Sequence, residues 1–434
     1  KRGELVDPIK PIVYYIDPAT PIKWRKYLKQ GVEAWNVAFA EAGFKNAIIA
    51  KDPPSPEEDP EFSPEDVRYS VIRYTANPIQ NAQGPHVHDP RTGEILESDI
   101  IWYHNVMNLL RNWYFVQTAA VNPKARKVKF DDDVMGPLIR FVSAHEVGHT
   151  LGFPHNMGAS SAYPVDSLRS PSFTQKMGTA PSIMDYARFN YVAQPGDGEV
   201  GLMPGIGIYD KYATRWGYRP IPEANSPEEE QETLNQWIKE HDDDPNYRYG
   251  PQQSFNLVDP SSQTEDIGDN AIKASQYGIA NLKRIVANLK NWIAADGENY
   301  DDLEELYFQV LGQWRRYMGH VTNNIGGIYQ TLKTYDQEGN VYSHVPKAHQ
   351  KEALKFLIDE AFKTPKWVLR DEILSNIEYA GAVERIRSSQ AFVLNRLMDF
   401  GRLARMIENE TMNGTEAYSR QIPVLRSLNI SRQE

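Results

Sequence analysis

One segment of the sequence brings together residue types that bind a metal ion and activate water. Residues 145–156 read His-Glu-Val-Gly-His-Thr-Leu-Gly-Phe-Pro-His-Asn. On a helix, His145 and His149 project from one face a single turn apart, so both imidazoles reach the same ion. Gly152 permits a positive φ and a sharp turn out of the helix, which brings His155 round as a third ligand. The spacing therefore predicts a three-histidine metal site.

Three neutral histidines with one open coordination position are typical of catalytic rather than structural zinc. Zn²⁺ in such a site lowers the pKa of bound water to about 7 and polarises a substrate carbonyl. Glu146 follows the first ligand, where it can accept the water proton and later pass it to a leaving amine. Five specified positions coincide, and a chance match anywhere in the chain is about 2 in 100,000. We therefore predict one catalytic Zn²⁺ rather than a set of buried structural histidines.

The pattern His-Glu-x-x-His-x-x-Gly-x-x-His resembles that of the metzincin clan of zinc peptidases. That clan has a methionine turn beneath the metal, and residues 182–186, Ser-Ile-Met-Asp-Tyr, match this turn. The resemblance implies that Met184 forms an apolar floor under the three imidazoles. It also implies that Tyr186 is either a fifth ligand or a phenol donor to the tetrahedral oxyanion. The alternatives are ordinary core packing for Met184 and a buried core tyrosine for Tyr186.

Further stretches resemble a narrower family, the bacterial zinc-dependent metalloproteases first catalogued as domains of unknown function. In full-length members of that family other domains precede the catalytic one, which agrees with a chain that begins at Lys1. Asn156, after the third ligand, differs from the Glu, Asp or Ser of astacins, adamalysins and matrixins, which argues against those three branches. The matching stretches cover most of the chain and are 167–169, 182–186, 209–210, 216–218, 259–260, 265–269 and 345–346.

The resemblance also implies how a peptide substrate is held. In metzincins an antiparallel edge strand of the upper subdomain pairs with an extended peptide, which then lies across the metal. Residues 84–88 are the expected edge strand, because Pro85 cannot donate a hydrogen bond within a ladder. We expect His86 and His88 to be solvated edge residues rather than a metal pair, since no third ligand is near in sequence.

The pocket for the side chain after the scissile bond is lined, by the same resemblance, by residues around the methionine turn. The residues expected there are Arg188, Phe189 and Asn190. Arg188 would either select an acidic substrate side chain or form a structural ion pair.

The elements that must position these residues mix strands and helices. Apolar and β-branched runs predict strands at 12–16, 47–50 and 67–75, and a hairpin that turns at 89–93 and continues as strand to 103. Apolar residues at steps of three and four predict helices at 28–39, 106–120 and 135–151, the last of which carries the first two histidines.

We therefore predict an α+β fold, in which a metzincin-like catalytic domain with a twisted mixed sheet and an active-site helix is followed by a mostly α-helical domain. The expected boundaries are 1–220 for the peptidase domain, with its upper subdomain to about 155 and its lower subdomain at about 156–220. A polar linker at 221–268 and a helical domain at 269–434 follow, with helices at about 347–363, 370–378 and 380–409.

Composition excludes several functions. Lys and Arg number 47 and Asp and Glu number 58, so the formal charge is 47 − 58 = −11, which argues against a nucleic-acid partner. The absence of cysteine excludes disulfides, thiol catalysis and iron–sulfur clusters. We expect no membrane span, because no apolar run approaches the ~20 residues that a bilayer requires. Export from a bacterial cell, to the periplasm, surface or medium, is expected from the resemblance alone, with the signal removed or outside these residues.

The resulting prediction is a zinc-dependent peptidase that acts on peptides or proteins. An endopeptidase is favoured, since the sequence contains no obvious arrangement for capturing a terminal amine or carboxylate. Two alternatives stay open: a catalytically inert metzincin-fold binding or scaffold protein, and a hydrolase of a non-peptide amide or ester. A zinc assay with a broad peptide panel separates the first alternative from the prediction.

Overall fold

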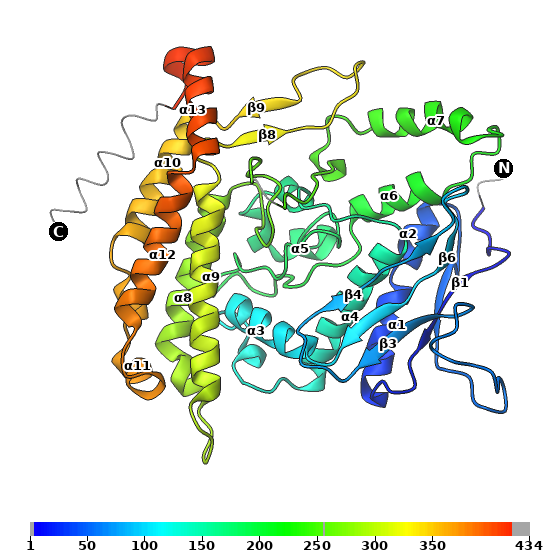
Figure 1. Cartoon of the computed structure of the whole chain (residues 1–434), viewed down its shortest axis with the longest axis horizontal. Helices are drawn as coiled ribbons and strands as arrows, with labels where there is room; N and C mark the ends of the chain where they lie inside the picture. The colour runs from blue at the N-terminus through cyan, green and yellow to red at the C-terminus, as the bar shows by residue number, and fades with distance from the viewer. Residues whose placement is uncertain (1–3, 255–256, 419–434) are drawn as a thin grey trace.

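A five-stranded mixed sheet organises the first half of the chain, in a computed structural model that describes residues 4–254 and 257–418. Four neighbouring strands run parallel, and a fifth is added antiparallel at one edge (Figure 1). The α+β fold expected from the sequence is confirmed. In spatial order the strands are β2 (Ile48–Lys51), β1 (Ile12–Ile16), β3 (Ser70–Thr75), β7 (Ile100–Tyr103) and β4 (Ala82–Gln83).

The antiparallel edge strand lies slightly before the segment expected for it. Residues 84–88 were predicted to form this edge, whereas the edge strand is β4 and the chain leaves the sheet after Gln83. The hairpin predicted from the turn at 89–93 is confirmed, because β5 (Val87–His88) pairs antiparallel with β6 (Ile95–Glu97) in a separate two-stranded sheet. Its second strand does not continue to residue 103 as predicted, because the chain passes to the five-stranded sheet, where the Asp99 carboxylate accepts from the N–H of Val71 (2.9 Å) before β7 begins.

The strand predicted at 67–75 begins later than its alternation of side chains indicates. The backbone N–H of Tyr69 donates to the carbonyl of Asp66 (2.9 Å) and closes a turn, so the first sheet residue is Ser70. Polar side chains that bond to nearby backbone favour turns over strands. Arg68 reinforces this turn through its ion pair with Asp66 (2.6 Å).

Helix α4 (Asp132–Thr150) carries the first part of the metal motif and packs beside α1 (Ile22–Glu33); α4 contacts β4 and β7, whereas α1 contacts β1 and β2. The hydroxyl of Tyr14 in β1 donates to Thr150 Oγ1 (2.6 Å) and connects the end of this helix to an interior strand of the sheet. The helix begins three residues before the predicted 135. The acidic residues in its first turn, Asp132 and Asp133, interact favourably with the positive end of the helix dipole and so stabilise the earlier start. The contact with the sheet therefore fixes the position of the end of α4, which carries His145 and His149.

Long helices make up most of the chain after residue 270. Residues 328–330 and 342–344 form a hairpin, β8 (Ile328–Gln330) with β9 (Tyr342–His344). Within the described ranges no helix is long and apolar enough to cross a membrane. The helices are α8 (Ala271–Ile293), α9 (Asp301–Thr322), α10 (Lys347–Leu357) extended by a π turn (Ile358–Phe362), α11 (Asp371–Ile377), α12 (Ala382–Leu397) and α13 (Phe400–Asn413).

The helix predicted at 380–409 is in fact two helices. The break falls at Met398 and Asp399, where the Asp399 carboxylate accepts a hydrogen bond from the backbone N–H of Arg402 (2.9 Å). Aspartate is a strong N-cap, so this side chain begins α13 instead of extending α12.

The segment 221–268 is only partly the polar, exposed chain that its composition indicates. Its first half contains α7 (Pro227–Lys239), which has no buried residue and is capped by Ser226. Its second half lies in the protein interior, where Asp259, Gln263 and Ile267 are buried. This half packs against the part of the chain that carries the histidine motif, as described below.

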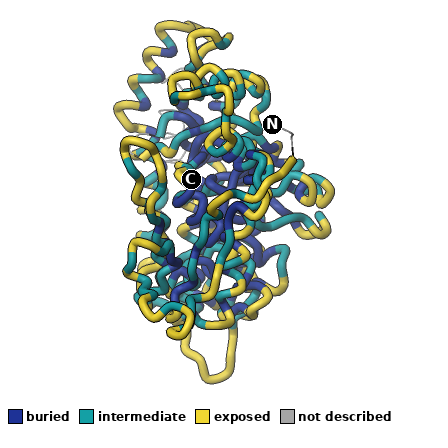
Figure 2. The backbone as a smooth tube through the Cα atoms, turned by 90° about the vertical axis from the view of Figure 1, so that its right-hand side faces the viewer, coloured by how far each residue is buried: buried dark blue, intermediate teal, exposed yellow. Residues whose placement is uncertain are grey.

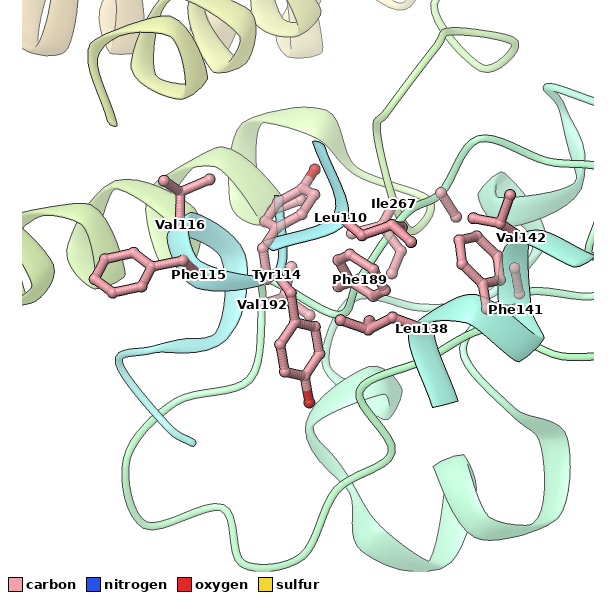
Figure 3. Close-up of a cluster of buried hydrophobic side chains, with 14 of the residues drawn as sticks. Leu110, Tyr114, Phe115, Val116, Leu138, Phe141, Val142, Phe189, Val192 and Ile267 are labelled. Atoms are coloured by element: carbon pink, nitrogen blue, oxygen red, sulfur yellow. The ribbon is translucent and has the colours of Figure 1, made fainter. Parts of the chain in front are cut away.

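The hydrophobic core is continuous from the sheet region to the long helices. Tyr114 of α3 (Val106–Thr118), Phe141 of α4 and Phe189 pack edge to face, with ring centroids 4.9 and 5.8 Å from that of Phe189 (Figure 3). Ile267 joins the same cluster. Buried residues run through the whole interior, as Figure 2 shows.

His320, near the end of α9, makes stability depend on pH. Its Nε2 donates to the carbonyl of Thr264 (2.9 Å), and burial lowers the pKa of this imidazole to about 4. In the unfolded chain a histidine titrates near pH 6.5. Between pH 6.5 and 4 the unfolded chain therefore binds a proton that the folded chain does not, so the free energy of unfolding falls as pH falls.

We expect wild type to lose about 1.4 kcal/mol more stability than His320→Gln when the pH drops from 7.5 to 5.5. Urea unfolding at both pH values measures the difference. The exposed His88→Gln variant serves as control and is expected to respond to pH as wild type does. Equal losses in wild type and His320→Gln would contradict the assignment.

Candidate active site

The turn that follows α4 has the geometry expected from Gly152. This residue has φ of 91°, the left-handed conformation that glycine adopts without strain. The N–H of Gly152 donates to the carbonyl of His149 (2.9 Å) and that of Phe153 to the carbonyl of Gly148 (3.0 Å), which is a Schellman ending. The chain thus leaves the helix sharply and returns with His155.

Each of the three motif histidines is oriented by an oxygen acceptor at its Nδ1. His145 Nδ1 lies 2.7 Å from the carbonyl of Ile183, and His149 Nδ1 lies 2.9 Å from that of Phe153. His155 Nδ1 lies 2.8 Å from Gln252 Oε1. Because these oxygens can only accept, each Nδ1 carries the proton and each Nε2 keeps its lone pair.

The remaining ring nitrogens converge in a way that fits a zinc ion. His149 Nε2 and His155 Nε2 are 3.0 Å apart, and neither has a proton to share once its Nδ1 is the donor. His145 Nε2 is buried and has no hydrogen-bond partner among the described residues. One nitrogen of each ring lies within 4.8 Å of the others, and these three histidines are the only such group in the described part of the chain. Three imidazole nitrogens are a known ligand set for Zn²⁺.

Burial keeps the three imidazoles neutral, which metal binding requires. It lowers the pKa of His145 well below its usual value, that of His149 to about 4, and that of His155 to a smaller extent. The neighbouring rings add to this effect, since a charged His149 would repel a charged His155.

Glu146 lies on the same helix turn with its carboxylate buried. The backbone N–H of Gly84 donates a hydrogen bond to this carboxylate, and burial raises the pKa of Glu146 to about 7 while Arg188 opposes the rise. Gly84 must be glycine, because a Cβ at this position would overlap the backbone carbonyl of Glu146. The chain directly after edge strand β4 therefore lies against the candidate general base.

Pro85 and His86 lie beside this site but not in a strand. Pro85 is exposed, and His86 Nδ1 donates to the carbonyl of His149 (3.2 Å). The rings of His86 and His88 are 5.5 Å apart, and within the described residues no third ligand joins them. His88 lies in β5, whereas His86 precedes that strand and is half-buried, so only His88 is the exposed strand residue that was expected.

Met184 packs against α4 between the first two histidine ligands. It is buried, and a Cβ at Gly148 would overlap its sulfur, which explains the glycine inside the motif. The turn that holds Met184 is anchored by Asp210 of α6 (Ile208–Tyr218), which accepts from Ser182 Oγ (2.6 Å) and from the N–H of Ile183 (2.8 Å).

Tyr186 faces the histidine group. Its ring centroid is 4.3 Å from that of His155 and 5.1 Å from that of His145. Burial raises the pKa of its phenol, so the hydroxyl is protonated at neutral pH. Within the described residues this hydroxyl makes no hydrogen bond, which leaves it free to donate to a substrate.

Arg188 forms a structural ion pair, one of the two roles expected for it. It is buried with φ of 56°, and its Nε lies 3.2 Å from Glu265 Oε1. Its guanidinium stacks between Trp113 (3.7 Å) and Tyr186 (4.1 Å). The other role, selection of an acidic substrate side chain, is not favoured, because the charge is already paired.

Phe189 and Asn190 were expected in a substrate pocket and are instead fully buried. Phe189 belongs to the hydrophobic core described above. Asn190 Nδ2 donates to the carbonyls of Leu168 (2.8 Å) and Gly201 (2.9 Å), so both side chains serve packing rather than substrate contact.

Gln252 is a site residue that sequence reasoning missed. Its contact with His155 depends on Asn156, whose Nδ2 donates to the carbonyl of Arg248 (2.9 Å) and whose Oδ1 accepts from the N–H of Gly250 (2.8 Å). The amide after the third ligand thus fastens the segment that carries Gln252. Asn156 stands where other metzincin branches have a different residue. This difference was the one feature of the sequence that could have pointed to the segment carrying Gln252.

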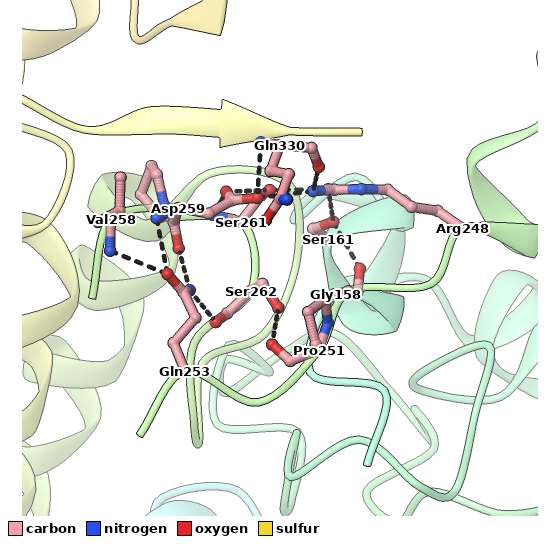
Figure 4. Close-up of polar contacts among 12 residues, drawn as sticks. Gly158, Ser161, Arg248, Pro251, Gln253, Val258, Asp259, Ser261, Ser262 and Gln330 are labelled. Atoms are coloured by element: carbon pink, nitrogen blue, oxygen red, sulfur yellow. Dashed lines mark hydrogen bonds and ion pairs between the residues drawn. The ribbon is translucent and has the colours of Figure 1, made fainter. Parts of the chain in front are cut away.

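The segment is secured from its other side by a polar network (Figure 4). Arg248 forms an ion pair with Asp259 (2.9 Å) and donates to Ser261 Oγ (2.7 Å) and to the carbonyl of Gln330 (2.8 Å). The Asp259 carboxylate also accepts from the N–H of Gln330 (2.9 Å). The β8–β9 hairpin therefore supports the loop that orients His155.

We expect Gln252→Ala to weaken zinc binding about 10- to 100-fold, because His155 loses the acceptor that orients its ring. Competition with a chelator measures the affinity. Gln252→Glu keeps an acceptor oxygen and is expected to retain wild-type affinity or to exceed it. Wild-type affinity in Gln252→Ala would show that this contact does not orient the ligand.

Comparison with protein families assigns the chain to one by its sequence. A family model described as Met-zincin matches residues 127–424, which is more than half of the chain and includes the metal motif, the methionine turn and the long helices. No curated protein and no solved structure matches the chain.

Proposed function

The chain belongs to the Met-zincin family, and on this premise we propose that it is a zinc-dependent endopeptidase in which His145, His149 and His155 hold the metal. Family membership supports a zinc metallopeptidase in general terms, and the proposal adds the residues and the type of cleavage. One observation carries the proposal. Each of the three histidines donates from Nδ1 to an oxygen, so its Nε2 lone pair stays available for a metal ion beside the buried Glu146.

Bound zinc supplies a Lewis acid that polarises a substrate carbonyl and lowers the pKa of water. The chain itself supplies proton transfer through Glu146. Its carboxylate accepts a proton from water as oxygen bonds to the carbonyl carbon, and delivers it to nitrogen as the C–N bond breaks. The products are a carboxylic acid and an amine. The hydrogen bond from Gly84 supports this role because it orients the carboxylate.

Tyr186 is proposed to stabilise the tetrahedral oxyanion. Its ring lies beside His145 and His155, and its protonated hydroxyl is not engaged by another described residue. A hydroxyl that is already positioned there can donate to the oxyanion as its negative charge develops, and this stabilises the transition state. Met184 supports the site from below through its packing on Gly148.

An extended peptide is proposed to add to the edge of β4. This strand pairs with β7 on one side only and ends the sheet. Backbone pairing at such an edge gives affinity without requiring one sequence, which suits cleavage within chains. The peptide would then run past Pro85 and His86 toward Glu146.

Three expectations stay predictions. These are the division at about 220 and 268 into peptidase domain, linker and helical domain, the export of the protein from a bacterial cell, and polypeptides as its substrates rather than other amides. The inert scaffold is the alternative that the next experiment addresses directly.

The test combines metal content with proteolysis. Purified wild type is analysed for zinc and incubated with a random peptide library that is read by mass spectrometry, with Glu146→Ala as control. We expect about one zinc in both proteins and internal cleavage by wild type alone. Trimming of ends only would replace endopeptidase by exopeptidase. Zinc without any cleavage would favour the scaffold, and absence of zinc after reconstitution would overturn the ligand assignment.

A further inference from the structure

A cluster of arginines lines two cavities among the long helices, and none of the three motif histidines lines either cavity. The cavities measure about 490 and about 320 Å³ and share lining residues of α9 and α12. Among the lining residues that the structure describes, the one carboxylate is that of Asp399, although the whole chain carries a net charge of −11. The arginines are Arg315 and Arg316 of α9, Arg396 of α12, and Arg402 and Arg405 of α13.

Three of these arginines have structural partners. Arg402 Nη1 donates to the carbonyl of Thr322 (2.7 Å) at the end of α9, and Arg405 Nε donates to that of Gly326 (3.0 Å). Cations at this end of a helix are favoured by the helix dipole. Arg316 forms an ion pair with Glu265. These side chains therefore need no further ligand.

Among the described residues, Arg315 and Arg396 have no such partner; Arg315 is exposed and Arg396 is half-buried. Their guanidinium groups lie 4.2 and 5.0 Å from the ring of Phe392, and neither makes an ion pair or hydrogen bond with another residue in the described ranges. Burial, together with the charge of Arg315, lowers the pKa of Arg396. Two like charges that face one cavity in this way repel each other. Water around the exposed Arg315 reduces this repulsion, and a bound anion would offset what remains of it.

We propose that this cleft binds a small phosphate-bearing molecule, with its phosphate group between Arg315 and Arg396. The planar fork of a guanidinium matches two phosphate oxygens at once. A phosphate monoester dianion neutralises both arginines, whereas one carboxylate neutralises a single arginine. The larger cavity has the volume of a small-molecule site. Ser388 and Asn395 of α12 line it as well and offer neutral hydrogen-bonding groups.

The test measures thermal unfolding of the whole chain with inorganic phosphate and with glycerol 3-phosphate, at constant ionic strength set by chloride. We expect either phosphate, well above its Kd, to raise the Tm of wild type by about 2 °C, while chloride has no such effect. Tighter binding of the ester than of phosphate would identify the molecule as a phosphate ester. Tighter binding of inorganic phosphate would replace the ester by the free ion within the same site.

Variants locate the effect. Arg315→Gln and Arg396→Gln are expected to lower phosphate affinity at least about tenfold. Without phosphate, Arg396→Gln should be at least as stable as wild type, because the repulsion is removed; this separates loss of a ligand from loss of folding. Arg396→Lys keeps the charge but not the fork and should bind more weakly than wild type.

Arg387→Gln is the matched control, since Arg387 lies on the same helix, is exposed and pairs with Glu384 (3.2 Å). It is expected to keep the wild-type response. An equal phosphate effect in wild type, Arg315→Gln and Arg396→Gln would overturn the proposal, and so would a wild-type response no larger than that to chloride. The readout is binding, so it is independent of peptidase activity at the histidine site.

Discussion

Glu146→Gln is expected to lower kcat/KM for peptide hydrolysis by about 10³-fold while the protein still binds one zinc. Glutamine has nearly the same shape as glutamate but cannot take up the proton that water must lose. The side chain would keep its place on α4 beside Gly84, whose N–H can donate to an amide oxygen as well as to a carboxylate. The variant therefore loses proton transfer but keeps the position of the side chain and the zinc site. Peptide cleavage rates and zinc content of the same preparation measure both.

The control for this variant is Glu232→Gln in the exposed helix α7. It makes the same chemical change far from the motif in sequence and should leave kcat/KM unchanged. If Glu146→Gln retained more than about one tenth of wild-type activity, another group would have to transfer the proton. Loss of zinc from Glu146→Gln would instead assign the carboxylate to the metal site.

His149→Ala is expected to lose both zinc and activity, with less than about one tenth of an equivalent of metal left after dialysis. His149 Nε2 lies 3.0 Å from His155 Nε2, and the ring is held by the carbonyl of Phe153 at the end of α4. Without it, only two imidazoles remain to replace the water ligands of the ion. Metal analysis of the purified protein, together with the peptide assay, measures the result.

His86→Ala is the matched control for the zinc experiment. His86 lies in the same neighbourhood, with its Nδ1 3.2 Å from the carbonyl of His149, but it is not part of the three-histidine group. It should keep one zinc per chain, with any loss of activity appearing in KM rather than in metal content. Zinc retained in His149→Ala and lost from His86→Ala would mean that the ligand set has been misassigned.

These two variants separate the metal from the proton transfer. Glu146→Gln should bind zinc without cleaving, and His149→Ala should do neither. The inert scaffold and the peptidase differ most clearly here, because only a peptidase has an activity that Glu146→Gln can remove.

The sequence by itself determined the features that depend on local geometry. The four-residue step from His145 to His149 places both rings on one face of α4, because a helix turns once in 3.6 residues. Gly152 ends that helix in the left-handed conformation, as its residue type and position predict. The mixture of strand and helix patterns likewise determined the α+β fold, since each pattern reflects the burial of one face of its own element.

Only the tertiary structure decided which distant residues complete the site. Gln252 reaches His155 across 97 positions of sequence, and no local pattern marks it. Gly84 is required because the chain after β4 touches the carbonyl of Glu146, a contact that neither segment reveals alone. Arg188 is paired because Glu265 is brought beside it. In each case packing between elements determines the partner. The sequence pattern of one element does not identify which distant element packs against it.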